Sequence, residues 1–123
     1  MNKLLLATAA TALMSGAAFA ESHTGDVKIG IELGFTGPLE SITPAMGAGA
    51  DLAIAEINAA GTLLDGATVT AIRADSTCID AGAATAAAEG LVTGDMVNAI
   101  MGADCSGVTG AVLQNVARPH GIV

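Results

Sequence analysis

The residues with the clearest chemical potential stand in one short loop, Ala103-Asp104-Cys105-Ser106-Gly107, which leads directly into a predicted helix. The free N–H groups of the first helical turn, at Ser106, Gly107 and Val108, would form an anion site together with the Ser106 hydroxyl. A substrate carboxylate would fit there without any cationic side chain. On local sequence alone a simpler interpretation is favoured, in which Ser106 or Asp104 only caps the helix.

Cys78 and Cys105 are the two cysteines of the chain. In an exported protein such a pair favours a disulfide, because the compartment is oxidising. A metal pair or a free thiol is the alternative, but neither cysteine has a close histidine or second cysteine at metal-ligand spacing. In the chain-entropy model a bridge over this loop stabilises the fold by about 3.5 kcal/mol. It would join two loops and hold Ser106 in place.

Nucleophilic and nucleotide chemistry are less favoured. A nucleophile at Cys105 or Ser106 would need a base, and His120 could approach only through folding. The glycines at 34 and 37 lack the third glycine of a dinucleotide fingerprint, and those at 102 and 107 lack the Lys-Ser/Thr of a phosphate loop. We expect no cofactor and no enzymatic activity.

Three acids, Asp75, Asp80 and Asp104, could gather round a cation. A helix cap at Asp80 and solvated loop acids at the other two positions is the simpler interpretation. We therefore expect no metal site.

Residues 1–20 are typical of a cleavable secretory signal peptide. Lys3 precedes an apolar run over 4–14, and Ala18-Phe19-Ala20 has the small-x-small pattern before a cleavage site. A membrane anchor is the alternative, but the apolar run is shorter than the roughly 20 residues that a spanning helix needs. We expect cleavage after Ala20 and export from the cytoplasm.

The mature chain would be strongly acidic. Removal of residues 1–20 takes away Lys3 but no acid, so three basic and twelve acidic side chains remain, for a net charge of −9. This charge disfavours binding to nucleic acid or to anionic lipid. Phe35 is the one mature aromatic residue, so this stretch has no base-stacking platform.

Strands alternate with helices along the mature chain. Hydrophobic alternation and turn residues predict strands over 27–33, 68–74 and 97–101, and a fourth beginning at 122. The first helix is expected to begin at Pro44 behind a Thr43 cap and to end at Gly61. The second is expected over 81–92 behind an Asp80 cap, and the third from 106 until Pro119 and Gly121 end it. The first helix carries an apolar stripe (Met46, Ala50, Ala53, Ile54 and Ile57), and the second is alanine-rich for close packing.

This order predicts an α/β fold, with a parallel sheet and helices on both faces. With strand order 2-1-3, the ligand crevice would lie between the loops 34–42 and 102–106. A central parallel strand is apolar on both faces, so we expect Lys28 and Glu32 near the strand ends or partly solvated. Because the chain stops two residues into a strand, residues 21–123 are expected to be part of a longer protein.

Several motifs along the mature chain carry a family resemblance: Thr36-Gly37-Pro38, Gly49-Ala50-Asp51-Leu52-Ala53, Ile57-Asn58-Ala59-Ala60-Gly61, Asp75 with Cys78, and Gly102-Ala103-Asp104-Cys105-Ser106. With them the sequence resembles the extracytoplasmic solute-binding proteins of branched-chain amino-acid type ABC transporters. The resemblance implies the type I periplasmic binding fold, in which two α/β lobes close on a small solute. Residues 21–123 would be the first part of lobe I.

The resemblance also implies roles for individual residues. In the amino-acid binders of this family, the serine after the second cysteine helps to hold the ligand's α-carboxylate, and Ser106 stands at that position. The Gly107 and Val108 amides and Asp104 would complete this part of the site, while Thr36 and Gly37 would line the crevice. Some amino-acid binders have a tyrosine near Ile42, and isoleucine supplies neither its ring nor its hydroxyl. The solute class therefore extends from leucine, isoleucine and valine to amides, urea and small acids.

The sequence thus predicts a periplasmic, non-enzymatic binding protein that delivers a small solute to an inner-membrane ABC permease. The alternative is a ligand-sensing domain of a receptor or regulator on the same fold. A secreted hydrolase is less favoured, since it would need a base near Cys105 or Ser106.

Overall fold

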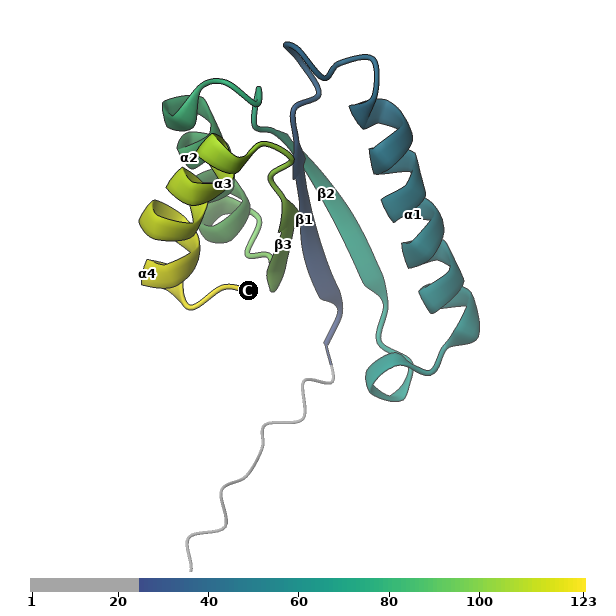
Figure 1. Ribbon diagram of the computed structural model, residues 1–123. Coiled ribbons are helices and arrows are strands. Elements are labelled where there is room, and N and C mark those ends of the chain that lie inside the picture. Colours follow the sequence, from purple (N-terminus) through teal and green to yellow (C-terminus); the bar gives the residue numbers. More distant parts are fainter. Residues whose placement is uncertain (1–24) are drawn as a thin grey trace, which may run out of the picture.

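The computed structural model describes residues 25–123 and is built on a three-stranded parallel sheet (Figure 1). The strands are β1 Val27–Leu33, β2 Val69–Asp75 and β3 Ala99–Gly102. Their order is β2-β1-β3, with Val27 opposite Val69 and Ile29 opposite Ala99. The predicted parallel α/β architecture and the 2-1-3 order are confirmed. The signal peptide prediction lies outside the described residues.

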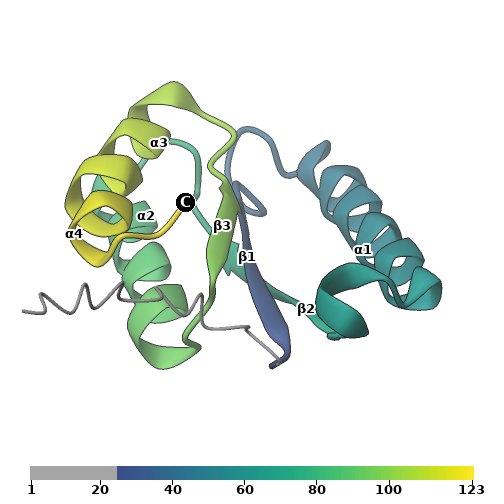
Figure 2. The same cartoon turned by 90° about the horizontal axis from the view of Figure 1, so that it is seen from below.

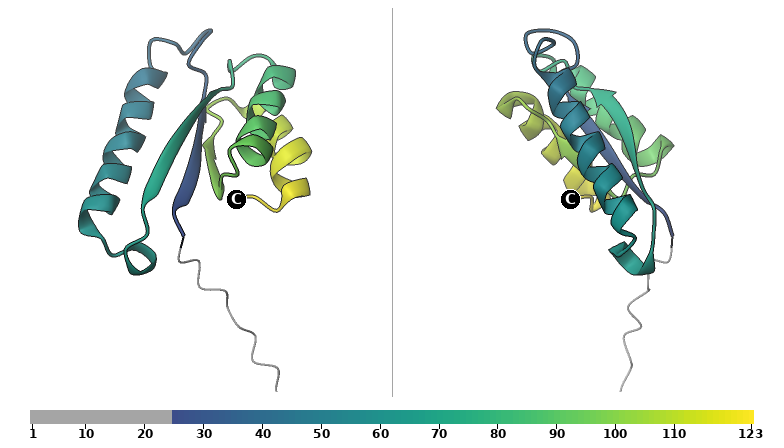
Figure 3. Two further views of the ribbon diagram at one scale, coloured as in Figure 1. Left: turned by 180° about the vertical axis from the view of Figure 1, so that it is seen from behind. Right: turned by 90° about the vertical axis from the view of Figure 1, so that its right-hand side faces the viewer.

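Helices cover the two faces of the sheet unequally. Helix α1 (Thr43–Ala60) lies alone on one face, and α2 (Ala81–Glu89), α3 (Ser106–Val112) and α4 (Arg118–His120) lie on the other (Figure 2). Seen from behind, the sheet stands between α1 and the remaining helices (Figure 3). Short π-helical turns extend α2 over Gly90–Gly94 and join α3 to α4 over Leu113–Ala117. None of the described helices is long and apolar enough to cross a membrane.

The core lies where α2 meets α3. It consists of small and β-branched side chains, all at most 5% exposed: Ala84, Ala88, Val108, Val112 and Val116. Alanine on α2 brings the two helices close together, because nothing larger separates their backbones. Asp80 caps α2 as predicted, its Oδ1 accepting hydrogen bonds from the N–H groups of Gly82 and Ala83.

The predicted start of α1 is partly wrong. Thr43 is the first helical residue rather than a cap, and Ile42 precedes it without a capping side chain. The Thr43 hydroxyl instead donates to the carbonyl oxygens of Gly34 (2.9 Å) and Leu39 (3.2 Å), so it fastens the helix to the loop after β1. The end is as predicted, since Gly61 adopts a left-handed conformation with φ +60°. In the described chain the apolar stripe stays largely uncovered, with Met46 43% and Ile57 40% exposed.

The last helical run ends at Gly121 as predicted, with φ +67°, but Pro119 does not end it. Pro119 lies within α4, directly after the π-helical turn over Leu113–Ala117. Beyond Gly121, the Val123 carbonyl accepts a hydrogen bond from Ile100 N–H of β3 at 2.9 Å. Residues 122–123 thus run beside β3 without forming an assigned strand.

Both charged residues of β1 lie near the ends of the strand, as expected, but they differ in burial. Lys28 lies near the start of the strand, and its Nζ donates to the Asp95 carbonyl at 2.9 Å. Glu32 is the next-to-last residue of the strand and is 0% exposed, so its side chain is not solvated. It stands opposite Ala74 on one side and Gly102 on the other, so both neighbouring strands flank it.

Candidate functional site

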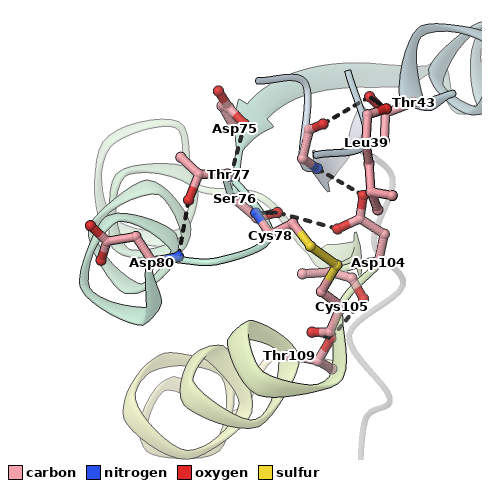
Figure 4. Close-up of a disulfide and its surroundings, with 12 residues drawn as sticks. Leu39, Thr43, Asp75, Ser76, Thr77, Cys78, Asp80, Asp104, Cys105 and Thr109 are labelled. Carbon is pink, nitrogen blue, oxygen red and sulfur yellow. Dashed lines mark hydrogen bonds between the residues drawn. A yellow bond between two sulfur atoms is a disulfide. The ribbon is translucent and has the colours of Figure 1, made fainter. Parts of the chain in front are cut away.

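The loops that leave the three strands meet at the carboxyl edge of the sheet, and a disulfide joins two of them. Cys78, after β2, is bonded to Cys105, after β3, with a Cα–Cα distance of 5.2 Å (Figure 4). This is the pairing that the sequence favours, and it excludes both cysteines from thiolate chemistry. Thr77 and Cys78 have φ values of +56° and +68°. Such conformations are sparsely populated by residues with a side chain, so the surrounding contacts must hold this turn.

A carboxylate ties all three loops together. Asp104 Oδ2 accepts a hydrogen bond from Gly34 N–H at 2.9 Å, and its Oδ1 accepts one from the Ser76 hydroxyl at 3.4 Å. Ser76 N–H in turn donates to the Leu33 carbonyl at 2.9 Å. Asp104, Ser76, Gly34 and the disulfide are called the hub below. Asp104 is therefore turned toward the neighbouring loops and does not cap α3.

A second carboxylate fixes the loop after β1. Asp75 accepts hydrogen bonds from the Thr36 hydroxyl (2.5 Å), Thr36 N–H (3.3 Å) and Thr77 N–H (2.9 Å). Burial tends to raise the pKa of Asp75, but these bonds, with one from Phe35 N–H, outweigh it and lower the pKa below 3.8. Gly37 has φ +85°, and a Cβ there would lie 2.8 Å from the Thr77 carbonyl oxygen. Glycine at this position lets the two loops pass in contact.

The first turn of α3 carries the residues for which the sequence predicts an anion site. The helix begins at Ser106, and no side chain caps it. Its first backbone hydrogen bond runs from Thr109 N–H to the Cys105 carbonyl (2.9 Å), so the amides of Ser106, Gly107 and Val108 precede the intrahelical ladder. Ser106 and Gly107 are exposed, while the Val108 side chain is buried in the core.

The structure gathers most of the predicted site residues at this edge. Ser106, Gly107 and Asp104 belong to the loop after β3, and Thr36 and Gly37 belong to the loop after β1, held through Asp75 and Thr77. Ile42 stands apart at the end of that loop, 55% exposed, and makes no core contact in the described chain.

Two polar residues at this edge make contacts that the sequence does not predict. The sequence assigns no role to Ser76, and it offers Asp75 as a cation ligand, as a loop acid and, with Cys78, as part of the family resemblance. Both stand at the carboxyl end of β2, and polar residues at strand ends in a parallel sheet were the available signal.

Glu32 lies beneath the hub without a polar partner. Neither of its carboxylate oxygens has a hydrogen bond in the described structure. Burial, and after it the charge of Asp104, raises the pKa of Glu32 from 4.5 to about 7. Near pH 7 the Glu32 carboxyl is therefore populated in both its protonated and its ionised form.

Within residues 25–123 the side chains offer anchoring rather than covalent or metal chemistry. No group of three or more metal-ligating side chains occurs there. His120 pairs with Glu89 at 3.3 Å on the outer surface and is not part of the hub. What remains at the carboxyl edge is a set of free amides, a serine hydroxyl and small loops, an arrangement suited to holding a small polar ligand.

The sequence and the fold both match known proteins. A sequence model of the family described as periplasmic binding protein matches residues 26–123. A comparison with curated protein sequences finds no match.

Solved structures resemble the chain over about four fifths of its length. The branched-chain amino acid transporter substrate binding protein LivJ from Streptococcus pneumoniae, in complex with isoleucine, is 34% identical, with a TM-score of 0.70 over 79% of this chain and 27% of its own. The leucine binding protein LivK from Thermotoga maritima is 25% identical, with a TM-score of 0.67 over 78% and 26%. An ABC-type branched-chain amino acid transporter from Rhodopseudomonas palustris, 24% identical with a TM-score of 0.71 over 80% and 26%, supports the fold alone. The chain spans about a quarter of the length of these proteins.

Proposed function

The chain belongs to the periplasmic binding protein family and has its type I fold, and from that premise we propose that it forms part of the solute-binding component of an ABC transporter. In this proposal the full protein captures a small solute in the periplasm and delivers it to a permease in the inner membrane. Residues 1–20 are its export signal, and residues 21–123 are the first part of lobe I. Binding requires no catalysis and no cofactor.

The observation that carries the proposal is the uncapped first turn of α3 above a rigid hub. The disulfide and the Asp104 bonds hold the loop after β3 against the loops after β1 and β2. The Thr109 hydroxyl donates to the Ala103 and Cys105 carbonyls at 2.6 and 2.9 Å, which fixes the same loop from the helix side. Preorganised donors bind an anion without the free energy needed to order them.

We assign the solute's carboxylate to the Ser106 hydroxyl and to the amides of Ser106, Gly107 and Val108. Thr36 and Gly37 would line the crevice on the opposite side, with Ile42 at its outer end. Asp104 would act by positioning the loop, since both of its oxygens already accept hydrogen bonds. Closure of the second lobe over this edge would report occupancy to the permease.

Aliphatic amino acids are the first solutes to test. The similar protein from Streptococcus pneumoniae is described in complex with isoleucine. Ile42 would leave an apolar rather than an aromatic wall at the outer end of the site, so amides, urea and small organic acids belong to the same screen.

The test is a thermal-shift screen of the full-length protein against these solutes. A solute at about 100 times its Kd should stabilise the protein by roughly 2.7 kcal/mol. Ser106→Ala should lower the affinity for a carboxylate solute about tenfold or more without changing the stability of the free protein. Thr62→Ala is a matched control, because Thr62 is exposed after α1 and its side chain caps nothing. A folded, oxidised protein that no solute stabilises would contradict the proposal.

A further inference from the structure

Glu32 is a fully buried acid near the end of β1. Alternate residues of a strand point to the same side of the sheet. The surroundings of Gly30 and Gly34, two residues before and after Glu32, therefore show what covers its face. A Cβ at Gly30 would lie 2.7 Å from Leu91, and one at Gly34 would lie 3.1 Å from Cys78 Cβ and 3.4 Å from Asp104 Oδ2. Glu32 therefore lies under α2 and α3, between the helical core and the hub.

No cation faces Glu32 from its own sheet. Lys28 shares the face but lies four residues earlier, about 13 Å along the strand, where it binds the Asp95 carbonyl. Arg73 of β2 is on the opposite face, paired with Asp51 of α1 and placed over the Phe35 ring at 5.4 Å.

The helices above Glu32 supply no compensating charge either. The two carboxylates at the ends of α2 are engaged elsewhere. Asp80 caps the helix, and Glu89 pairs with His120. Neither β3 nor the run from Ser106 to Ala117 carries a titratable side chain, and Arg118 of α4 is exposed. Asp104 is thus the one charged group that acts on Glu32 here, and it has the same sign.

We propose that Glu32 couples protonation to solute capture: a carboxylate bound at Ser106 draws a proton onto the buried carboxyl of Glu32. The inference rests on the proposed function. Its physical basis is that a third negative charge near Asp104 and Glu32 raises the proton affinity of the acid that has no hydrogen bond. Asp104 already accepts two hydrogen bonds, which favour its ionised form, so the proton goes to Glu32.

Coupling between two binding events is reciprocal. If an anionic solute favours the protonated acid, then protons favour the bound solute. Because the pKa of Glu32 is about 7 in the free protein, the acid is partly ionised at pH 7.5 and has a proton to gain. Affinity should therefore rise as the pH falls from 8.5 to 6.

The experiment is isothermal titration calorimetry of the full-length protein at pH 7.5. L-isoleucine is the first probe, followed by the carboxylate solutes that give a shift in the thermal screen. The dependence of the binding enthalpy on buffer ionisation, in HEPES and in Tris, gives the number of protons taken up per solute. We expect uptake of roughly half a proton or more, and an affinity several-fold higher at pH 6 than at pH 8.5. Glu32→Gln should abolish both effects.

Glu56→Gln is the matched control, since Glu56 is exposed on α1, and it should keep the proton uptake of the wild type. Carbon-13 spectra of the glutamate carboxyls in the wild type read the protonation of Glu32 without any substitution, should the variant fail to fold. A solute that binds with no proton uptake refutes the coupling and leaves the proposed function standing. Absence of any binding in a folded protein refutes both, and proton uptake that survives in Glu32→Gln refutes the assignment to Glu32.

Discussion

Removal of the disulfide should test how the carboxyl edge of the sheet is held. The perturbation is the double variant Cys78→Ser/Cys105→Ser in the full-length protein. The bridge spans 27 residues, for which the chain-entropy model gives a stabilisation of about 3.5 kcal/mol at 25 °C. Thr77 and Cys78 would then be free to leave their left-handed conformations, and that relaxation would return roughly 1–3 kcal/mol. We expect a net loss of about 0.5–2.5 kcal/mol.

The assay is urea unfolding of the oxidised protein, followed by circular dichroism. With a slope of about 2 kcal/mol per M urea, the urea midpoint of the lobe should fall by roughly 0.3–1.3 M. Reduction of the wild type with dithiothreitol should give a similar fall, which controls for the serines themselves. The solute affinity should fall as well, because Ser106 follows Cys105 directly. A variant as stable as the oxidised wild type would refute the reasoning and would show that the Asp104 bonds alone hold the loops.

Two further predictions concern contacts away from the disulfide. Asn58→Ala removes two hydrogen bonds, one from the Asn58 side-chain amide to the Val69 carbonyl (2.9 Å) and one from Val69 N–H to Asn58 Oδ1 (2.8 Å). Urea unfolding should show that the free energy of unfolding falls by about 1–3 kcal/mol. No fall would mean that other contacts hold α1 to β2. Asp75 has a lowered pKa in the folded protein, so its stabilisation is present above about pH 4 and is lost as the pH falls through the folded pKa. Asp75→Asn should flatten the acid side of the stability–pH curve, and an unchanged acid limb would contradict this role.

The arrangement of the fold could be predicted because its signals are local. The alternation of Val27, Ile29, Ile31 and Leu33 marks β1, and the glycine after α1 marks the end of that helix. Once strands and helices alternate, right-handed crossovers leave few topologies, and the 2-1-3 order follows. The disulfide could be favoured from two cysteines in an exported chain, since no other partner was at hand.

The wrong predictions, for the caps at Thr43 and Asp104, concern side chains whose partners lie elsewhere in the chain. Thr43 is of a residue type that caps helices, but its hydroxyl donates to the Gly34 and Leu39 carbonyl oxygens instead. Asp104 is of a residue type that caps helices, but its carboxylate accepts hydrogen bonds from Gly34 N–H and the Ser76 hydroxyl and does not cap α3. Local propensity describes what a side chain is able to do, and the tertiary neighbours decide which of those bonds forms.

Burial of the Glu32 side chain also depends on residues distant in sequence. A central parallel strand is buried on both faces, and Glu32 follows that rule although its side chain is ionisable. The β1–β3 register places it beside Gly102, where a Cβ would lie 2.0 Å from the Glu32 carbonyl oxygen. The sequence of either strand alone does not reveal this close approach of the two backbones.

The central position of β1 has a consequence for the order in which the chain folds. Val27 pairs with Val69, 42 residues later, and Ile29 pairs with Ala99, 70 residues later. No hairpin can form, so the segment emerges from the ribosome first and waits with both edges unpaired, and such non-local pairing is slow. In the unfolded chain Lys28 and Glu32 are solvated and ionised, and they interrupt an otherwise apolar run. The acid that is buried without a partner in the folded sheet thus places a charge on β1 while the strand is unpaired, and such charges beside hydrophobic strands oppose association between chains.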